Sequence, residues 1–134
     1  MAIKKIDHVA IVVKDIETAL KVYRDALGLE LTKTEFMPEQ AAMTAFLPAG
    51  ESKIELVEPT TDDSGTARYL AKRGEGVHHI CLEVDDIEAT LAQMAAWGMR
   101  LIDERPRTGS DGQRYAFVHP KSAHGVLIEL YERP

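Results

Sequence analysis

The residues with the clearest potential for chemistry are two histidines and two glutamates, His8, His79, Glu55 and Glu129. Each of them lies in a short apolar stretch that is typical of a strand. A carboxylate inside a sheet costs several kcal/mol unless it is paired, protonated or bound to a metal. Neutral imidazoles and carboxylates together suit a divalent ion such as Co²⁺, Mn²⁺, Ni²⁺, Fe²⁺ or Zn²⁺. The four residues therefore predict a site for one divalent metal ion, if the fold brings them together.

The four residues form two pairs because the sequence contains one module twice. IDHVAIVVKDIETAL (residues 6–20) aligns with VHHICLEVDDIEATL (77–91), and this alignment matches the two histidines. KIELVE (53–58) aligns with LIELYE (127–132), and this alignment matches the two glutamates. Such self-similarity indicates two copies of one structural unit. Each copy is therefore expected to contribute one histidine and one glutamate.

The alternation of side chains along a strand indicates which way the histidines point. Val9 and Ile11 share one face of the first strand, and His8 lies on the other. The apolar face is expected to pack against a helix, so His8 and its counterpart His79 should point away from the helices. Two histidines stand side by side before Ile80. Because side chains alternate along a strand, His78 points to the side that faces the helix and is the weaker ligand candidate. The glutamates alternate with apolar neighbours in the same way.

Each module is predicted to consist of a strand, a helix and three further strands, which places the chain in the α+β class. The modules are expected over about residues 3–58 and 76–132, joined by a short helix that Asp63-Ser64 caps and that ends near Gly74. The predicted strands are 6–13, 29–33, 42–47 and 53–57 in the first module, and 77–84, 99–102, 114–118 and 126–131 in the second.

The helix of each module has matching start and stop signals. Asp15 and Asp86 precede apolar residues at helical spacing and are predicted N-caps. Gly28 and Gly98 follow at the places where a glycine commonly ends a helix.

Composition excludes several classes of partner. The chain has 134 residues and a net charge of -6, without a basic block, which argues against nucleic acid and anionic lipid as partners. The single cysteine, Cys81, cannot form an intrachain disulfide and suits a reducing compartment. Neither a secretory signal nor an apolar run long enough for a membrane span is present. These features predict a soluble cytoplasmic protein.

Several longer motifs resemble one family. They are IDHVAI, the PEQ at 38–40, IELVEPTTDDS, YLAKRGEGVHHI, the GSDG at 109–112, FVHPKS at 117–122 and GVLIEL at 125–130. With these motifs, in this order over nearly the whole chain, the sequence resembles the methylmalonyl-CoA epimerase family of the vicinal oxygen chelate (glyoxalase/bleomycin resistance/dioxygenase) superfamily. The resemblance implies tandem βαβββ modules that form a half-open curved mixed sheet around a metal, as one domain over residues 1–134.

The resemblance also implies a reaction and a set of site residues. His8, Glu55, His79 and Glu129 would bind one divalent metal ion. The enzyme would interconvert (2R)- and (2S)-methylmalonyl-CoA by proton transfer at C2 through a metal-stabilised enolate, with Glu129 as one acid/base group. The implied partner is a CoA thioester, and the implied assembly is a homodimer.

The sequence departs from some members of the family at Thr44. These relatives have a second glutamate there, which serves as the opposite acid/base. Glu39 is close in sequence but lies on the turn and is a weaker candidate for that role. Glu55, a metal-bound water or another group would serve instead, and Thr44 becomes a substrate-contact candidate. Arg107 and Lys121 are candidates for binding the CoA phosphates or the substrate carboxylate, as is Arg105, and the alternative is that these are solvated surface charges.

Two other functions fit the same pattern. One is a glyoxalase I-like lactoylglutathione lyase, which needs similar metal chemistry but a different substrate pocket. The other is a metal-free small-molecule-binding protein of the same fold, although such a protein would be expected to lose the ligand set that this chain keeps.

Overall fold

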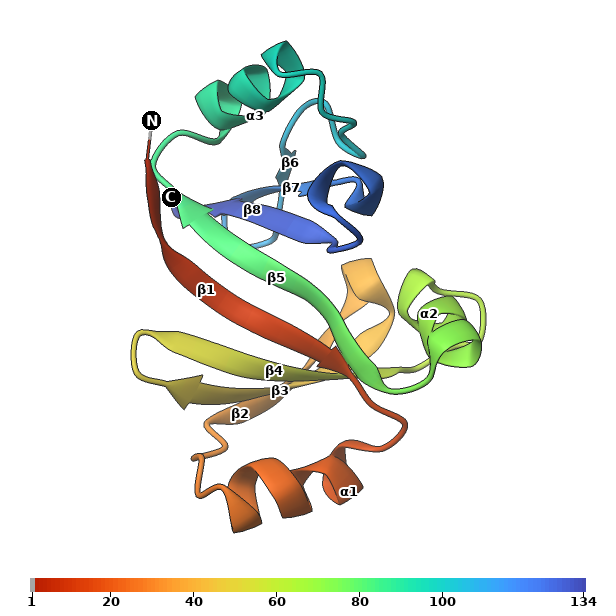
Figure 1. The fold of residues 1–134 in the computed structure, drawn as a ribbon. Helices are drawn as coiled ribbons and strands as arrows, with labels where there is room; N and C mark the ends of the chain where they lie inside the picture. Colours follow the sequence, from red (N-terminus) through yellow and green to blue (C-terminus); the bar gives the residue numbers. More distant parts are fainter. Residues whose placement is uncertain (1) are drawn as a thin grey trace. The chain divides into compact units, whose positions relative to one another are not determined.

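Each half of the chain has the predicted strand, helix and three-strand order, which confirms the α+β fold with two βαβββ modules. The computed structural model describes residues 2–134. The first module consists of β1 (Ile3–Val12), α1 (Ile16–Leu20), the π-helical η1 (Lys21–Ala26), β2 (Lys33–Met37), the 3-10 helix η2 (Pro38–Gln40), β3 (Ala42–Ala49) and β4 (Ser52–Pro59). The second consists of β5 (Gly76–Val84), α3 (Ile87–Ala96), β6 (Arg107–Thr108), β7 (Arg114–Val118), the 3-10 helix η3 (Pro120–Ala123) and β8 (Ile128–Glu132). Helix α2 (Gly65–Arg73) lies between them in the chain (Figure 1).

The chain divides into two compact units. We call His8–His78 the N-terminal unit, and the residues up to Asp7 together with His79–Pro134 the C-terminal unit. The strand order is β2-β3-β4-β1 in the first module and β5-β8-β7-β6 in the second. In both modules the first strand pairs in parallel with the last, and the remaining neighbours pair antiparallel. The strand with the histidine and the strand with the glutamate are therefore neighbours in each module.

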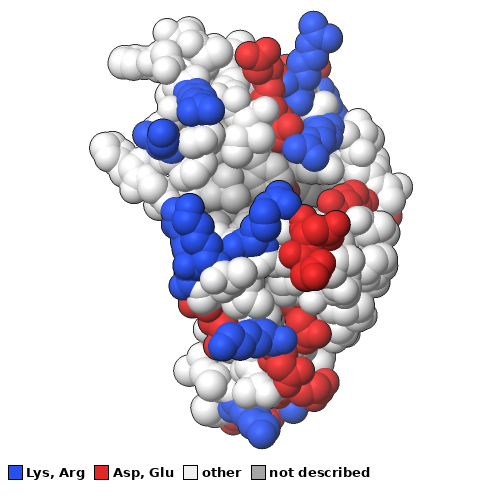
Figure 2. Space-filling model, turned by 90° about the vertical axis from the view of Figure 1, so that its right-hand side faces the viewer, with Lys and Arg blue, Asp and Glu red and all other residues white. Residues whose placement is uncertain are grey.

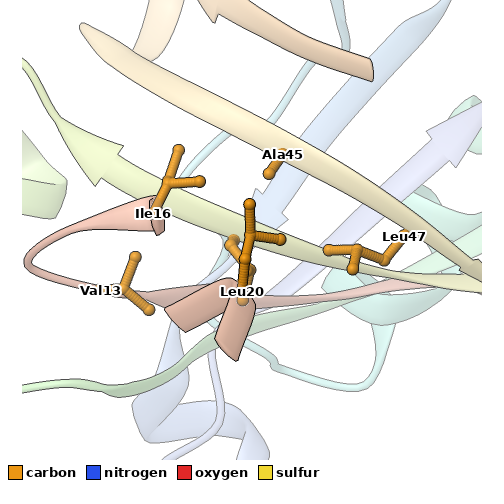
Figure 3. Packing of buried hydrophobic residues seen from close by; sticks show 6 residues of the cluster. Val13, Ile16, Leu20, Ala45 and Leu47 are labelled. Atoms are coloured by element: carbon orange, nitrogen blue, oxygen red, sulfur yellow. The ribbon is translucent and has the colours of Figure 1, made fainter. Parts of the chain in front are cut away.

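In the N-terminal unit, α1 covers one face of the strands. Ile16 and Leu20 of the helix pack with Ala45, Leu47 and Leu56 of β3 and β4 (Figure 3). Removing these apolar side chains from water stabilises the unit and fixes which face of the strands is internal. The opposite face is thereby left for the polar residues of β1 and β4.

The C-terminal unit repeats this arrangement with α3. Ile87 and Leu91 of the helix pack with Ala116, Val118 and Leu130 of β7 and β8. Val13 of the first module lies in the core beneath α1, and Val84 of the second lies in the core beneath α3. Both side chains therefore face the helix of their module, as the alternation along the strands predicted. Figure 1 shows each helix lying against the strands of its own module.

Acidic residues hold the start of each helix. The carboxylates of Asp15 and Asp86 accept the backbone N–H groups of Thr18 and Ala89, both at 3.0 Å, which confirms the two predicted N-caps. A second acidic contact was not predicted from sequence. Glu58 accepts the N–H of Ile16, and Glu132 accepts that of Ile87, at 2.8 and 3.0 Å. The last strand of each module is thus tied to the first turn of its helix.

Two predicted strands are wrong. Residues 29–33 and 99–102 are not regular strands, since β2 begins at Lys33 and β6 only at Arg107, while Leu101 forms an isolated bridge with Val118. The apolar residues at 29 and 31, and at 99 and 101, instead pack against the cores beneath α1 and α3. Their alternation reflects an extended connection that follows a helix, and not a ladder of strand hydrogen bonds.

The connecting helix α2 has the predicted limits. Ser64 caps it by accepting the N–H of Ala67, and Gly74 follows its last turn with a positive φ of 78°. Tyr69 and Leu70 pack against a cluster of buried apolar residues that β1, β3 and β4 supply, on the face opposite α1. Neither α2 nor any other helix within residues 2–134 is long and apolar enough to cross a membrane.

Candidate active site

His8 and Glu55 form a buried pair in the N-terminal unit. The parallel register of β1 and β4 places Ala10 opposite Glu55, and His8 lies two residues before Ala10 on the same face. Nδ1 of His8 is 3.1 Å from Oε2 of Glu55, and the two side chains are only 9% and 13% exposed. The pair lies on the face of the strands that α1 does not cover.

His79 and Glu129 form the equivalent pair in the C-terminal unit. The register of β5 and β8 places Cys81 opposite Glu129, so His79 shares its face. Nε2 of His79 is 3.0 Å from Oε1 of Glu129, and the side chains are 4% and 9% exposed. The ring of Phe117, which is opposite Glu129 in the β7–β8 register, lies edge-on to the imidazole at 5.6 Å. The imidazole is thus fixed from two sides.

The donor chemistry of the two pairs fits a divalent metal ion. Each pair offers imidazole nitrogen and carboxylate oxygen, a set that suits ions between hard and soft. Charged carboxylates are seldom buried to this degree unless they are paired with a cation or bind a metal ion.

His78 has a different environment from His79, since its ring lies edge-on to Tyr69 of α2 at a centroid distance of 5.0 Å. Of the histidine doublet, it is therefore His79 that pairs with a glutamate.

Thr44 lies in β3 on the same face as Glu55. It is opposite Val57 in the antiparallel register with β4, while Phe46 is opposite Glu55. Only 1% of Thr44 is exposed, and its hydroxyl has no hydrogen-bond partner among residues 2–134. A buried hydroxyl in this state can bind an acceptor that the protein itself does not supply.

Arg107 lies on the edge strand β6, next to the Glu129 face. Its guanidinium binds Asp103 at 2.9 Å and stacks over the ring of Tyr115 at 5.7 Å. The hydrogen bond to Asp103 raises the pKa of Arg107 above its ordinary value, so the side chain stays positively charged. Tyr115 and Phe117 share a face of β7, and Phe117 is opposite Glu129. Arg107 is thereby held as a cation beside the face that carries Glu129.

Arg105 and Lys121 have different surroundings. Arg105 lines a groove on the helix side of the C-terminal unit, together with Leu91 of α3 and Leu101. Lys121 lies on η3, where its backbone N–H donates to Nδ1 of His119. Of the two arginines considered from sequence, only Arg107 contacts a residue on the Glu129 face.

The surface mixes positive and negative side chains. Figure 2 shows lysines and arginines beside aspartates and glutamates over one side of the molecule. Exposed pairs of opposite charge include Lys33 with Glu35 and Arg24 with Asp25, each at 2.9 Å.

Sequence reasoning missed a buried charged cluster in the C-terminal unit. Asp7 and Glu83 are 3% and 5% exposed. Arg133 binds both, with Nε 2.9 Å from Glu83 and a terminal nitrogen 3.1 Å from Asp7. Asp7 directly precedes His8 in β1, and Glu83 is on the same strand as His79. The signal available in the sequence was an acidic residue within each of two predicted strands, Asp7 in the first and Glu83 in the second.

Comparison with known proteins places these residues in a family context. Residues 7–117 match the model of the Glyoxalase/Bleomycin resistance protein/Dioxygenase superfamily. A mitochondrial methylmalonyl-CoA epimerase of Dictyostelium discoideum is 37% identical over 134 residues, covering 99% of this chain and 81% of the relative. An ethylmalonyl-CoA/methylmalonyl-CoA epimerase of Cereibacter sphaeroides is 37% identical over 130 residues, covering 96% of this chain and 97% of the relative.

A solved structure is similar over the same length. It is a methylmalonyl-CoA epimerase in complex with methylmalonyl-CoA and NH₄⁺. It superimposes with a TM-score of 0.87 at 39% sequence identity, covering 98% of this chain and 95% of that chain. The fold is therefore shared with a protein that was solved in complex with methylmalonyl-CoA.

Proposed function

Because the chain belongs to the glyoxalase/bleomycin resistance protein/dioxygenase superfamily, we propose that it interconverts (2R)- and (2S)-methylmalonyl-CoA by moving the proton at C2. The observation that carries the proposal is the buried His–Glu pair in each unit, at 3.1 Å for His8–Glu55 and 3.0 Å for His79–Glu129. An epimerase needs a group that removes a proton and a group that returns one. Two separately held carboxylates meet this requirement.

The same four residues are proposed to hold one divalent metal ion. Their imidazole and carboxylate donors accept Co²⁺, Mn²⁺, Ni²⁺, Fe²⁺ or Zn²⁺. When bound, the ion would supply Lewis-acid stabilisation of the negative charge that develops on the thioester oxygen. His8 and His79 would contribute nitrogen donors, and Glu55 and Glu129 would contribute oxygen donors.

Glu129 and Glu55 are proposed to transfer the protons. In one direction Glu129 takes the C2 proton, and the electron pair of the C–H bond moves into the thioester to give the enolate. Glu55, as the carboxylic acid, then returns a proton to C2 from the opposite face. The reverse reaction uses the same groups with exchanged protonation states. His79 and His8 keep the two carboxylates oriented through their contacts.

Substrate binding is proposed to use residues around the pairs. Arg107, held as a cation by Asp103, would bind a phosphate or carboxylate of the thioester. Lys121 would add a second positive charge from η3, and Thr44 would contact the acyl group. We further propose that residues 1–134 act as one functional domain, that the active form is a homodimer, and that the reaction takes place in the cytoplasm.

Deuterium exchange tests the proposed reaction most directly. Wild-type protein loaded with Co²⁺ is incubated with methylmalonyl-CoA in D₂O, and the C2 proton is followed by NMR. We expect deuterium to enter C2 and both epimers to form. No exchange in the loaded protein would refute the epimerase proposal.

The same preparation distinguishes the alternatives. A glyoxalase I-like enzyme would convert the hemithioacetal of glutathione and methylglyoxal and leave methylmalonyl-CoA unchanged. A metal-free binding protein would bind no stoichiometric metal and catalyse neither reaction.

A further inference from the structure

Thr44 lies on the sheet face that carries the His8–Glu55 pair. In the antiparallel register of β3 and β4, Thr44 is opposite Val57 and Phe46 is opposite Glu55. Residues in register share a face, as do residues two apart along a strand, so Thr44 is the diagonal neighbour of Glu55. Diagonal neighbours are separated by about 7–8 Å, and one small bound group can contact both.

The hydroxyl of Thr44 differs from those of the other buried threonines. Thr66 and Thr90 are also buried, but their hydroxyls contact Ser64 Oγ and the backbone oxygen of Asp86. Thr44 is the most deeply buried of the three, and its Oγ1 has no hydrogen-bond partner in the part of the chain that the structure describes. A buried hydroxyl without a partner destabilises the protein, whereas a valine of nearly the same shape would not. Folding alone therefore gives no reason for a hydroxyl at this position.

Two different environments meet at Thr44. On one side, Val57 belongs to the apolar cluster that α2 covers with Tyr69. The buried residues of that cluster are alanines and valines, whose side chains carry no hydrogen-bond acceptor, and the hydroxyl of Tyr69 is bonded to the backbone oxygen of Val77. On the other side is Glu55, whose carboxylate contacts His8 at 3.1 Å. On the neighbouring strand β2, Glu35 is opposite Thr44, but it is exposed and pairs with Lys33 at 2.9 Å. A molecule bound on the Glu55 side can supply the acceptor that the hydroxyl lacks.

The residue of the second module that corresponds to Thr44 is Tyr115. Val57 aligns with Tyr131 in the repeat, and Tyr131 is opposite Tyr115, so Thr44 and Tyr115 correspond. The ring of Tyr115 contacts the guanidinium of Arg107 at 5.7 Å. In the first module the corresponding neighbour is Glu35, which is opposite Thr44 in the β2–β3 register. Its carboxylate pairs with Lys33 at 2.9 Å, and no hydrogen bond joins it to the hydroxyl of Thr44.

We infer that Thr44 Oγ1 donates a hydrogen bond to an oxygen of the acyl group of the substrate, an inference that rests on the proposed function. A dicarboxylic acyl thioester presents only acceptor oxygens next to C2, and the carboxylate of Glu55 is also an acceptor. Thr44 supplies the neutral donor that this side of the site needs. The hydrogen bond is made only when substrate is bound, so it contributes to catalysis and not to the stability of the free protein.

Two substitutions at Thr44 test the inference through two independent measurements. Thr44→Val removes the hydroxyl and keeps the shape, and Thr44→Ser keeps the hydroxyl and removes a methyl group. For Thr44→Val we expect kcat/KM for methylmalonyl-CoA to fall about tenfold. This factor corresponds to the free energy that one hydrogen bond to a charged acceptor contributes. The urea midpoint of the free protein should stay equal to that of the wild type or rise. Thr44→Ser should retain kcat/KM within about threefold, since the donor remains.

Other outcomes would overturn the inference. A lower urea midpoint for Thr44→Val would show that the hydroxyl has a partner within the protein. An unchanged kcat/KM with an active wild type would show that Thr44 binds no substrate oxygen, and would leave the epimerase proposal standing. A wild type that catalyses no exchange would refute the epimerase proposal, and with it this inference.

Discussion

The carboxylate of Glu129 lies 3.0 Å from Nε2 of His79, and both side chains are more than nine-tenths buried. Parallel pairing of β5 with β8 sets this distance, because it puts the two residues on one face of adjacent strands. The pair His8–Glu55 arises in the same way from β1 and β4. A parallel pairing of the first and last strand in each module is therefore the feature that creates both halves of the proposed site.

Replacing Glu129 with glutamine should abolish proton transfer at C2. The amide keeps the size of the side chain and a ligand oxygen but cannot accept the proton, so we expect the rate of deuterium exchange to fall by about 10²–10⁴-fold. The matched control is Glu17→Gln, because Glu17 is an exposed carboxylate on α1. Exchange by Glu129→Gln at the rate of the Glu17→Gln control would contradict the role of Glu129 as acid or base.

Replacing either paired histidine with asparagine should weaken metal binding. We expect about one divalent ion per wild-type chain after dialysis, and at least a tenfold weaker affinity in His8→Asn and His79→Asn, because one of four donors is lost. Metal content is measured by atomic emission after dialysis against a weak chelator. His124→Asn is the control, since His124 is exposed and has a positive φ of 56° that asparagine tolerates. Equal metal content in all four proteins would argue against this ligand set.

The sequence predicted the modules well because the repeat doubled each weak signal. One histidine in a strand says little about chemistry, but matching pairs at His8 and His79, and at Glu55 and Glu129, marked the same sheet face in both halves. The caps at Asp15 and Asp86 were predictable because capping is a local interaction between a side chain and the next turn. The metal, its ligand set and the roles of these residues stay predictions.

Features that depend on distant contacts were not predictable. The apolar residues at 29 and 31 indicated a strand, yet they pack beneath a helix. Arg133 is at the C-terminal end of the chain and reaches Asp7 at the other end, and no local pattern signals such a pair. The absence of a partner for Thr44 Oγ1 also becomes visible only when every neighbouring group of the described residues has been placed.

Arg107 and Arg105 should differ in their effect on substrate binding. Arg107 stacks on Tyr115 next to the Glu129 face, whereas Arg105 lines the groove on the helix side. We expect Arg107→Gln to raise KM for methylmalonyl-CoA about fivefold with little change in kcat, as for loss of one partly exposed charge pair. Arg105→Gln removes the same charge and should leave KM unchanged. An equal effect of both substitutions would indicate general electrostatic attraction, and no specific contact of Arg107.

Replacing Arg133 with glutamine should destabilise the C-terminal unit. The substitution removes the guanidinium that binds the buried carboxylates of Asp7 and Glu83. Because Arg133 itself is half exposed, we expect a loss of about 1–3 kcal/mol in the free energy of unfolding, less than for a fully buried pair. The control is Arg24→Gln, which breaks an exposed pair with Asp25 and should change stability by less than about 0.5 kcal/mol. Urea unfolding of both variants measures the difference. If Arg133→Gln were no less stable than Arg24→Gln, the two acidic residues would have to be stabilised by groups other than Arg133.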